Sequence, residues 1–160
     1  MPFYQLDSTD IRILQLLQEN ARLTNKEIAS KLNKTESPTL RRIKRLEDEG
    51  FIKNYVAILD NQKIGRGLMA FTHVQLKDHS QKGLTDFEQE IIRFPEVLEC
   101  YHMSGEYDFI LRVAVKDLPS YHLFLMSKLF AIMAVGSVQS TFVMKEAKNQ
   151  TALVIDTAAS

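Results

Sequence analysis

Residues 24–50 read Thr24-Asn-Lys-Glu-Ile-Ala-Ser-Lys-Leu-Asn-Lys-Thr-Glu-Ser-Pro-Thr-Leu-Arg-Arg-Ile-Lys-Arg-Leu-Glu-Asp-Glu-Gly50, and they predict two helices joined by a tight turn. Thr24 and Glu27 have the spacing of a capping box, in which each side chain bonds the other residue's backbone amide. The second helix is predicted over 36–49, because Gly50 then follows it at the left-handed position that ends many helices. The stretch therefore has the form of a helix-turn-helix.

The residues on either side complete a small domain. Apolar residues recur at three- and four-residue spacing between Asp7 and Asn20, which predicts a preceding amphipathic helix. After Gly50, the apolar stretch 51–59 is typical of one or two β-strands. Three helices followed by a strand are the order of a winged helix-turn-helix domain, which we expect over residues 1–59.

The rest of the chain changes to alternating strands and helices. Residues 60–67 are polar, contain two glycines and are expected to be a linker. Residues 68–160 then predict a βαββαβ, ferredoxin-like domain, so the whole chain is α+β. One face of its sheet is left without helices, and we expect Phe71, Val113 and Phe142 on that face, under a second copy of the chain. The expected strands are 68–77, 97–103, 107–115 and 137–145, with helices at 85–94 and from 117 or 120 to 130, and a short edge at 153–155.

Composition restricts the class of protein. The 160 residues carry no net formal charge, contain one cysteine and have no apolar run long enough for a membrane span. With no signal peptide at the N-terminus, a cytoplasmic protein is expected. The neutral average hides a basic cluster at 31–45, which predicts one surface for an anionic partner.

The basic cluster falls on the predicted second helix of the motif, so double-stranded DNA is the expected partner. The first turn of such a helix usually meets base edges, whereas later cations reach phosphates. Leu40, Ile43 and Leu46 are expected on its inner side. The base-reading candidates are Glu36, Ser37, Thr39 and Arg41, and the candidates for positioning the helix by charge are Arg42, Lys44 and Arg45.

No other chemistry stands out in the sequence. The four histidines are scattered without metal-ligand spacing, and no glycine-rich phosphate loop is present. No acidic pair has the neighbouring nucleophile or base that an active site needs. Cys100 lies on a predicted strand and is expected to be a small buried side chain. We therefore expect neither an enzyme nor a bound metal or cofactor.

The chain resembles the Lrp/AsnC, or feast/famine, family of transcriptional regulators. The resemblance rests on 23–32 and 37–52 in the first half, on Pro95-Glu-Val97 with Ser104-Gly-Glu-Tyr-Asp108, and on 140–146. It implies dimers formed through the sheets of the regulatory (RAM) domain, with the strand after the winged helix intertwined. It also implies assembly toward octameric rings, a palindromic DNA site, and an amino acid bound between dimers as effector.

The resemblance and the turn chemistry together suggest where the effector binds. Ser104, Gly105, Glu106 and Asp108 form a turn whose backbone and carboxylate suit a zwitterion; Gln139, Ser140 and Thr141 correspond to the family's last strand and would complete the site. A purely structural turn, with Gly105 at positive φ and Asp108 bonding turn amides, explains the same residues. The effector would be an amino acid such as leucine or methionine, between which no motif decides.

Two other functional interpretations remain open. The chain could be a small-molecule sensor whose helix-turn-helix contacts protein, or an enzyme built on the ferredoxin-like half.

The sequence before the last strand differs from that of many relatives. They have Pro-Gly-Val there, whereas this chain has Met133-Ala-Val135. Alanine in a left-handed turn would cost about 1 kcal/mol or more, so a different helix end is expected there.

Overall fold

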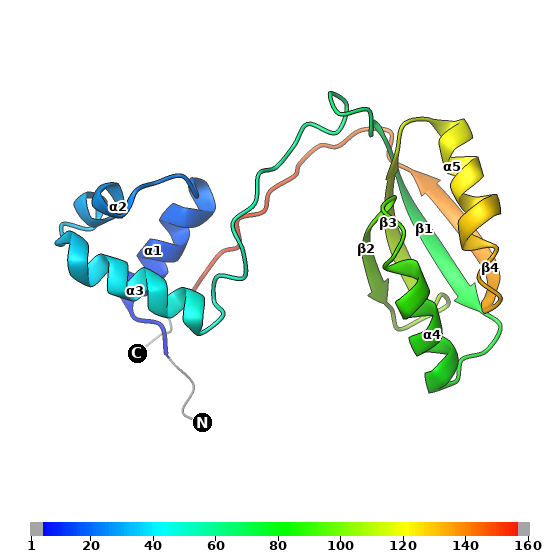
Figure 1. Cartoon of the computed structure of the whole chain (residues 1–160), viewed down its shortest axis with the longest axis horizontal. Helices are drawn as coiled ribbons and strands as arrows, with labels where there is room; N and C mark the ends of the chain where they lie inside the picture. Colours follow the sequence, from blue (N-terminus) through cyan, green and yellow to red (C-terminus); the bar gives the residue numbers. More distant parts are fainter. Residues whose placement is uncertain (1–4, 157–160) are drawn as a thin grey trace. The chain divides into compact units, whose positions relative to one another are not determined.

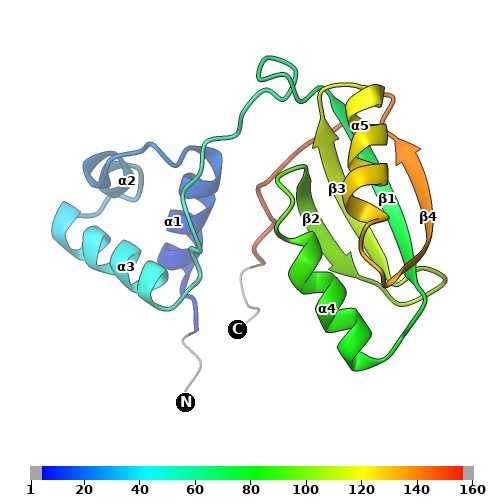
Figure 2. The same cartoon turned by 45° about the vertical axis from the view of Figure 1, so that its right-hand side comes forward.

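The structure is a computed structural model that describes residues 5–156, and it forms two compact units (Figures 1 and 2). The first comprises the N-terminal residues up to Ala57 together with the C-terminal residues from Lys148. The second comprises Ile58–Ala147. The chain thus passes from the first unit into the second and returns. No helix within residues 5–156 is long and apolar enough to cross a membrane.

Three helices build the first unit, as the sequence predicts: α1 (Ser8–Glu19), α2 (Asn25–Lys31) and α3 (Glu36–Asp48). The capping box of α2 is confirmed, since Glu27 N donates to Thr24 Oγ1 at 3.2 Å and Thr24 N donates to Glu27 Oε2 at 2.7 Å. Gly50 has φ +76°, which agrees with the expected left-handed helix end. The helices bury one cluster formed by Ile13, Leu14, Leu16, Ile28, Ile43 and Leu46.

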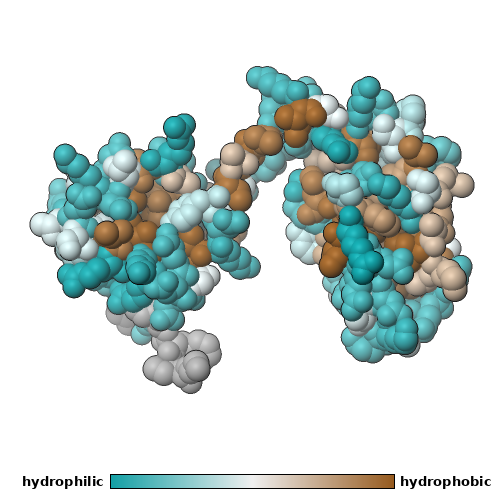
Figure 3. All heavy atoms as spheres, viewed as in Figure 1, coloured by the Kyte–Doolittle hydropathy of each residue, from teal (hydrophilic) through white to brown (hydrophobic). Residues whose placement is uncertain are grey.

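The expected strand at 51–59 does not form. These residues make no β-ladder, and Val56, Ile58 and Leu59 are more than half exposed. Figure 3 shows the apolar side chains along this extended segment between α3 and the second unit. A strand needs a hydrogen-bonded neighbour, and residues 5–156 of one chain supply none. This segment, the 51–59 arm, therefore lacks a neighbouring strand within residues 5–156, although Ile52 packs against the helical core and Tyr55 OH donates to Glu47 Oε1 at 2.8 Å.

The C-terminal residues also differ from expectation. The sequence predicts 148–160 as part of the second domain with an edge strand at 153–155, whereas the described part of this tail, 148–156, belongs to the first unit and forms no strand. Gln18 of α1 holds it with two bonds: Leu153 N donates to Gln18 Oε1 at 2.6 Å, and Gln18 Nε2 donates to Leu153 O at 3.1 Å. Ile155 packs against the helical core.

The second unit is the expected antiparallel sheet with two helices on one face (Figure 2). Its elements are β1 (Leu68–Leu76), α4 (Gln81–Ile91), β2 (Val97–His102), β3 (Phe109–Val115), α5 (Leu118–Phe124), η1 (Leu125–Leu129) and β4 (Val135–Phe142). The strands lie in the order β2-β3-β1-β4, so β2 and β4 are the edges. Helix α4 begins four residues earlier than expected, with Ser80 as N-cap, and α5 continues into a π-helical turn, η1.

The strand register decides which residues face the helices. Ala70 of β1 is fully buried against the helices and stands opposite both Val113 and Phe142. Val113 and Phe142 therefore lie on the helix-covered side, and their expected place on the bare face is wrong. Phe71 does lie on the bare face, 37% exposed, opposite Arg112 and Thr141.

The stretch Met133-Ala-Val135, which stands where many relatives have Pro-Gly-Val, leads into β4 without backbone strain. Ala134 does not adopt positive φ, and its carbonyl accepts a hydrogen bond of 2.8 Å from Lys77 N. Strand β4 starts at Val135, two residues earlier than expected. A Cβ at Gly136 would lie 3.1 Å from Gln75 O, so glycine permits this close approach of β4 to β1.

Candidate functional site

The outer face of α3 gathers the basic residues. Ile43 and Leu46 are buried in the first unit, which turns the opposite side of the helix to solvent. The predicted contact residues Ser37, Arg41, Lys44 and Arg45 are exposed on that side, and Glu36 is exposed as the first residue of the helix.

Two positions on α3 exchange the places expected for them. Thr39, predicted to read bases, is 2% exposed, and its hydroxyl donates to Thr35 O at 2.9 Å. Leu40, predicted to lie in the core, is 47% exposed on the outer face. Thr39 is therefore unavailable to DNA. Leu40 becomes a candidate for apolar contact with a thymine methyl group. It was not among the sequence-based candidates because an apolar residue on a helix is ordinarily expected in the core.

Arg42 makes an ion-pair cluster with α1 rather than pointing free into solvent. Its Nη1 donates to Asp10 Oδ1 at 2.8 Å and to Asp7 Oδ2 at 2.6 Å. Asp10 has no side-chain exposure, and Arg45 Nη2 lies 3.6 Å from the same Asp10 oxygen. We call Asp7, Asp10, Arg42 and Arg45 the helix clamp. Its geometry ties the basic helix to α1, so Arg42 positions the helix through protein contacts.

The pKa shifts of Asp7 and Arg42 agree with these ion pairs. Burial of Asp7 acts to raise its pKa, but the hydrogen bonds from Asp10 N and Arg42 outweigh burial and leave the pKa below its ordinary value. Hydrogen bonds to Asp10 and then Asp7 raise the pKa of Arg42. Asp7 and Arg42 are therefore charged at neutral pH.

The turn between β2 and β3 holds the first group of predicted effector residues. Ser104, Gly105 and Glu106 are exposed, and Gly105 has φ +140°, which confirms the expected positive φ. Met103 N donates to Asp108 O at 2.8 Å and closes the turn. The exposed turn thus offers backbone groups and the Glu106 carboxylate to solvent.

Asp108 is engaged within its own chain. Leu76 N donates to Asp108 Oδ2 at 2.7 Å, and His79 Nδ1 lies 2.8 Å from Asp108 Oδ1. Burial acts to raise the pKa of Asp108, but the bonds from Leu76 and His79 outweigh it, so the pKa is lowered. The stabilisation from this carboxylate is present above its ordinary pKa and is lost as the pH falls through the lowered value.

The three predicted residues on β4 do not share one face. Gln139 and Thr141 lie on the bare side, and Gln139 Oε1 accepts a hydrogen bond from Tyr107 OH of the turn. Ser140 points to the helix side, where it accepts from Tyr121 OH at 2.6 Å. The structure thus brings Gln139 next to the turn and separates Ser140 from it.

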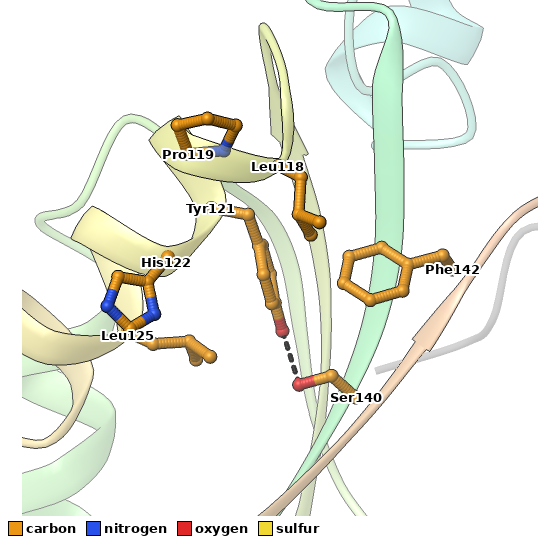
Figure 4. Close-up of a pocket in the computed structure, with 7 residues that line it drawn as sticks. All are labelled: Leu118, Pro119, Tyr121, His122, Leu125, Ser140 and Phe142. Carbon is orange, nitrogen blue, oxygen red and sulfur yellow. Dashed lines mark hydrogen bonds between the residues drawn. The ribbon is translucent and has the colours of Figure 1, made fainter.

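Ser140 lines an open apolar groove between α5 and β4, with a volume of about 530 Å³. Figure 4 shows Tyr121 reaching from α5 to Ser140, with Leu118 and Phe142 beside its ring. Thr72 Oγ1 lies 2.6 Å from the Tyr121 hydroxyl, so the phenol is held from both strands. This groove is a second candidate surface that the sequence did not indicate, because it depends on the packing of α5.

Metal ligands and a reactive thiol are the other kinds of site to consider among the described residues. No group of three or more His, Cys, Asp or Glu in this part of the chain could hold a metal ion. Burial first, and then the charge of Glu88, raises the pKa of Cys100 to about 11, which keeps the thiol protonated.

Family models match both units. The model described as "Lrp/AsnC ligand binding domain" matches residues 69–153, more than half of the chain. The model described as "Winged helix-turn-helix DNA-binding" matches residues 6–53. Together they cover the helical unit with α3 and the sheet unit with the turn.

Individual relatives match over nearly their whole length. The Bkd operon transcriptional regulator of Pseudomonas aeruginosa is 38% identical over 141 residues, which are 88% of this chain and 92% of that protein. The DNA-binding transcriptional activator DecR of Escherichia coli is 37% identical over 151 residues, 94% of this chain and 99% of that protein. A transcriptional regulator from Neisseria meningitidis, solved in complex with L-methionine, has a TM-score of 0.90 at 39% identity, covering 94% of this chain and 97% of that one.

Proposed function

Because the chain belongs to the Lrp/AsnC family of transcriptional regulators, we propose that it reads a palindromic DNA site through α3 and that an amino acid modulates this binding. The observation that carries the proposal is the exposed face of α3. It presents Arg41, Lys44 and Arg45 on a helix whose other side is buried. Cations on such a helix suit the major groove and its phosphates.

Arg41 and Lys44 are expected to have different roles on DNA. Arg41→Ala should relax sequence preference, at a cost of about 1–3 kcal/mol on the preferred site. Lys44→Ala should weaken binding evenly across sequences and flatten the salt dependence by about one phosphate contact. We choose Lys44 over Arg45 because Arg45 also lies 3.6 Å from Asp10. Gel-shift titrations on genomic fragments at two salt concentrations measure both effects.

Lys82→Ala is the matched control, since its side chain is 84% exposed on α4 of the other unit. It should bind DNA like the parent. If the parent binds no fragment even at low salt, a sensor whose helix contacts protein is the better interpretation. If all three variants bind like the parent, α3 is not the reading helix.

We place the effector between copies of the chain. In one chain the turn lies where β3 begins, whereas the groove with Ser140 and Phe142 lies beside the far half of β4. Gln139 beside the turn lies on the bare side of the sheet and Ser140 in the groove lies on the helix side, so we propose that a single site that uses both the turn and the groove is formed by two chains. A methionine complex of a Neisseria meningitidis relative supports an amino acid as the ligand, and leucine or methionine would suit the apolar groove.

Asp108→Ala is expected to abolish the response to the effector while leaving the dimer intact. The substitution removes the carboxylate that orders the turn through Leu76 N. Loss of a charged hydrogen-bonding group should weaken effector binding about tenfold or more. Calorimetry against the twenty amino acids measures this. His79→Ala is the control, because it removes a neighbour of Asp108 but keeps the carboxylate; unchanged affinity in Asp108→Ala would take Asp108 out of the site.

We also propose a homodimer formed through the bare face of the sheet, with further assembly toward an octamer. The bare face carries Phe71 with Ile110 of β3 and Tyr101 of β2, which is 52% exposed. Arg112 Nε on this face is buried yet has no hydrogen-bond partner in the described chain. A second copy would cover the apolar side chains, and its 51–59 arm would gain a neighbour for the strand that one chain leaves unformed.

A further inference from the structure

A second cavity lies at the opposite end of β3 from the turn. Its volume is about 430 Å³, and it opens between the start of β1, the end of β3 and helix α5 with η1. The turn precedes Phe109, whereas the cavity adjoins Val115. The length of β3 at about 3.3 Å per residue separates the two by roughly 20 Å. The polar residues of the lining are Arg66, Glu96, Lys116, Ser120, Ser127 and Lys128.

Glu96 is the buried acceptor of this cavity. Lys128 Nζ donates to its Oε1 at 2.7 Å, and the Glu96 side chain is 17% exposed. Its Oε2 is buried and has no hydrogen-bond partner within residues 5–156. Burial acts to raise the pKa of Glu96, but the bond from Lys128 and the positive charges of Lys128 and Arg66 outweigh it and lower the pKa. An ionised, buried oxygen without a donor is unfavourable, so this position favours a ligand that brings a hydrogen-bond donor.

The charges around the cavity narrow the class of ligand. Arg66, Lys116 and Lys128 bring three positive charges to the lining, against the single carboxylate of Glu96. A simple anion would leave Glu96 Oε2 without a donor, and a simple cation would be repelled by the three basic side chains. A zwitterion satisfies both requirements, since its ammonium can donate to Oε2 while its carboxylate meets Arg66 or Lys116. Leu123 and Phe124 supply apolar lining for a side chain.

We propose that this cavity binds an α-amino acid, as a second site distinct from the effector site at the β2–β3 turn. The inference goes beyond the proposed function, whose effector site uses the turn and the groove between α5 and β4. The ligand ammonium donates to Glu96 Oε2, its carboxylate contacts Arg66 and Lys116, and its side chain lies against Leu123. Each chain then takes up two amino acid molecules.

Calorimetric titration of the full chain with each of the twenty protein amino acids tests the proposal, using Glu96→Gln. Glutamine keeps the volume and can still accept from Lys128 through its carbonyl, but its amide nitrogen donates where Oε2 must accept. We expect at least one amino acid to bind with two molecules per chain, and Glu96→Gln to weaken one of the two by about tenfold or more. Glu90→Gln, an exposed carboxylate on α4, should leave both unchanged.

Two variants separate this proposal from the effector site. Asp108→Ala should remove the other binding event and keep the one that depends on Glu96. Lys116→Gln, at an exposed position, should weaken the Glu96-dependent event without a change in thermal unfolding. The second site is refuted if no amino acid binds, or if binding is one molecule per chain, is lost in Asp108→Ala and is equal in Glu96→Gln and the parent. This last result would leave the proposed effector site standing.

Discussion

Replacing Arg42 by methionine is expected to lower the free energy of unfolding of the helical unit by about 2–3 kcal/mol. The reason is Asp10, whose carboxylate has no exposed surface and receives a 2.8 Å hydrogen bond from Arg42. Removing one member of a buried ion pair costs about 3–5 kcal/mol. We expect less here because Arg42 is one-third exposed, Asp7 is half exposed, and Arg45 remains near Asp10.

The measurement is calorimetric unfolding, because the chain contains no tryptophan and two units unfold in it. The transition of the helical unit should move to lower temperature while that of the sheet unit stays. Lys44→Met is the matched control, since it removes one cation from the same helix at an exposed position. Equal unfolding temperatures for the two variants would refute a stabilising role for the clamp.

A double variant distinguishes a structural clamp from a DNA contact. Arg42→Met combined with Asp10→Leu replaces the buried pair by apolar groups, which is often neutral for stability. It should recover part of the stability lost in Arg42→Met, because Asp10→Leu also removes the capping-box bond from Asp7 N to Asp10 Oδ2. If Arg42 acts through helix position, the double variant should also regain DNA affinity. If a stable double variant still binds DNA weakly, Arg42 contacts the DNA directly, as its place in the basic cluster predicts.

Local signals in the sequence were sufficient for most of the helices and strands. The capping box of Thr24 and Glu27 and the positive φ of Gly50 are local signals, which depend only on residues close by in the sequence. The bounds of α2 and α3 therefore follow closely from the sequence. The role of Arg42 could not be read in this way. Its partners Asp7 and Asp10 lie 35 and 32 residues away along the chain, and no spacing rule connects them.

Register and partners account for the remaining differences. Successive residues of a strand face opposite sides, so a shift of one residue moves a side chain to the other face. Phe142 was expected beside Phe71, but β4 places Thr141 opposite Phe71 and Phe142 opposite Ala70. The same alternation places Gln139 on the bare face and Ser140 on the helix side. The 51–59 strand was expected from its composition, but a ladder needs a second strand, which one chain does not provide.

Phe71→Glu is expected to convert the dimer into monomers and to weaken DNA binding about a hundredfold or more. In the single chain the new carboxylate would lie opposite Arg112, which already pairs with Glu99, and the resulting ion pair would be hydrated. In a dimer the same pair would have to lose its hydration under a second sheet, which costs several kcal/mol. A dimer places two recognition helices on one duplex, and this avidity strengthens binding about 10²–10⁴-fold. A monomer should therefore bind a palindrome far less tightly than the parent.

Sedimentation velocity and gel shifts on the same samples measure both effects, and the mass should fall to the 18.4 kDa of one chain. Ile92→Glu is the control, because Ile92 is 70% exposed at the end of α4 and does not lie on the bare sheet face. It makes the same change from an apolar to an acidic side chain and should remain dimeric. The opposing Arg112 keeps Phe71→Glu compatible with folding, so its circular dichroism should match that of the parent. A folded Phe71→Glu that stays dimeric would show that the bare face is not the interface, and the exposed 51–59 arm would then be the surface through which two copies join.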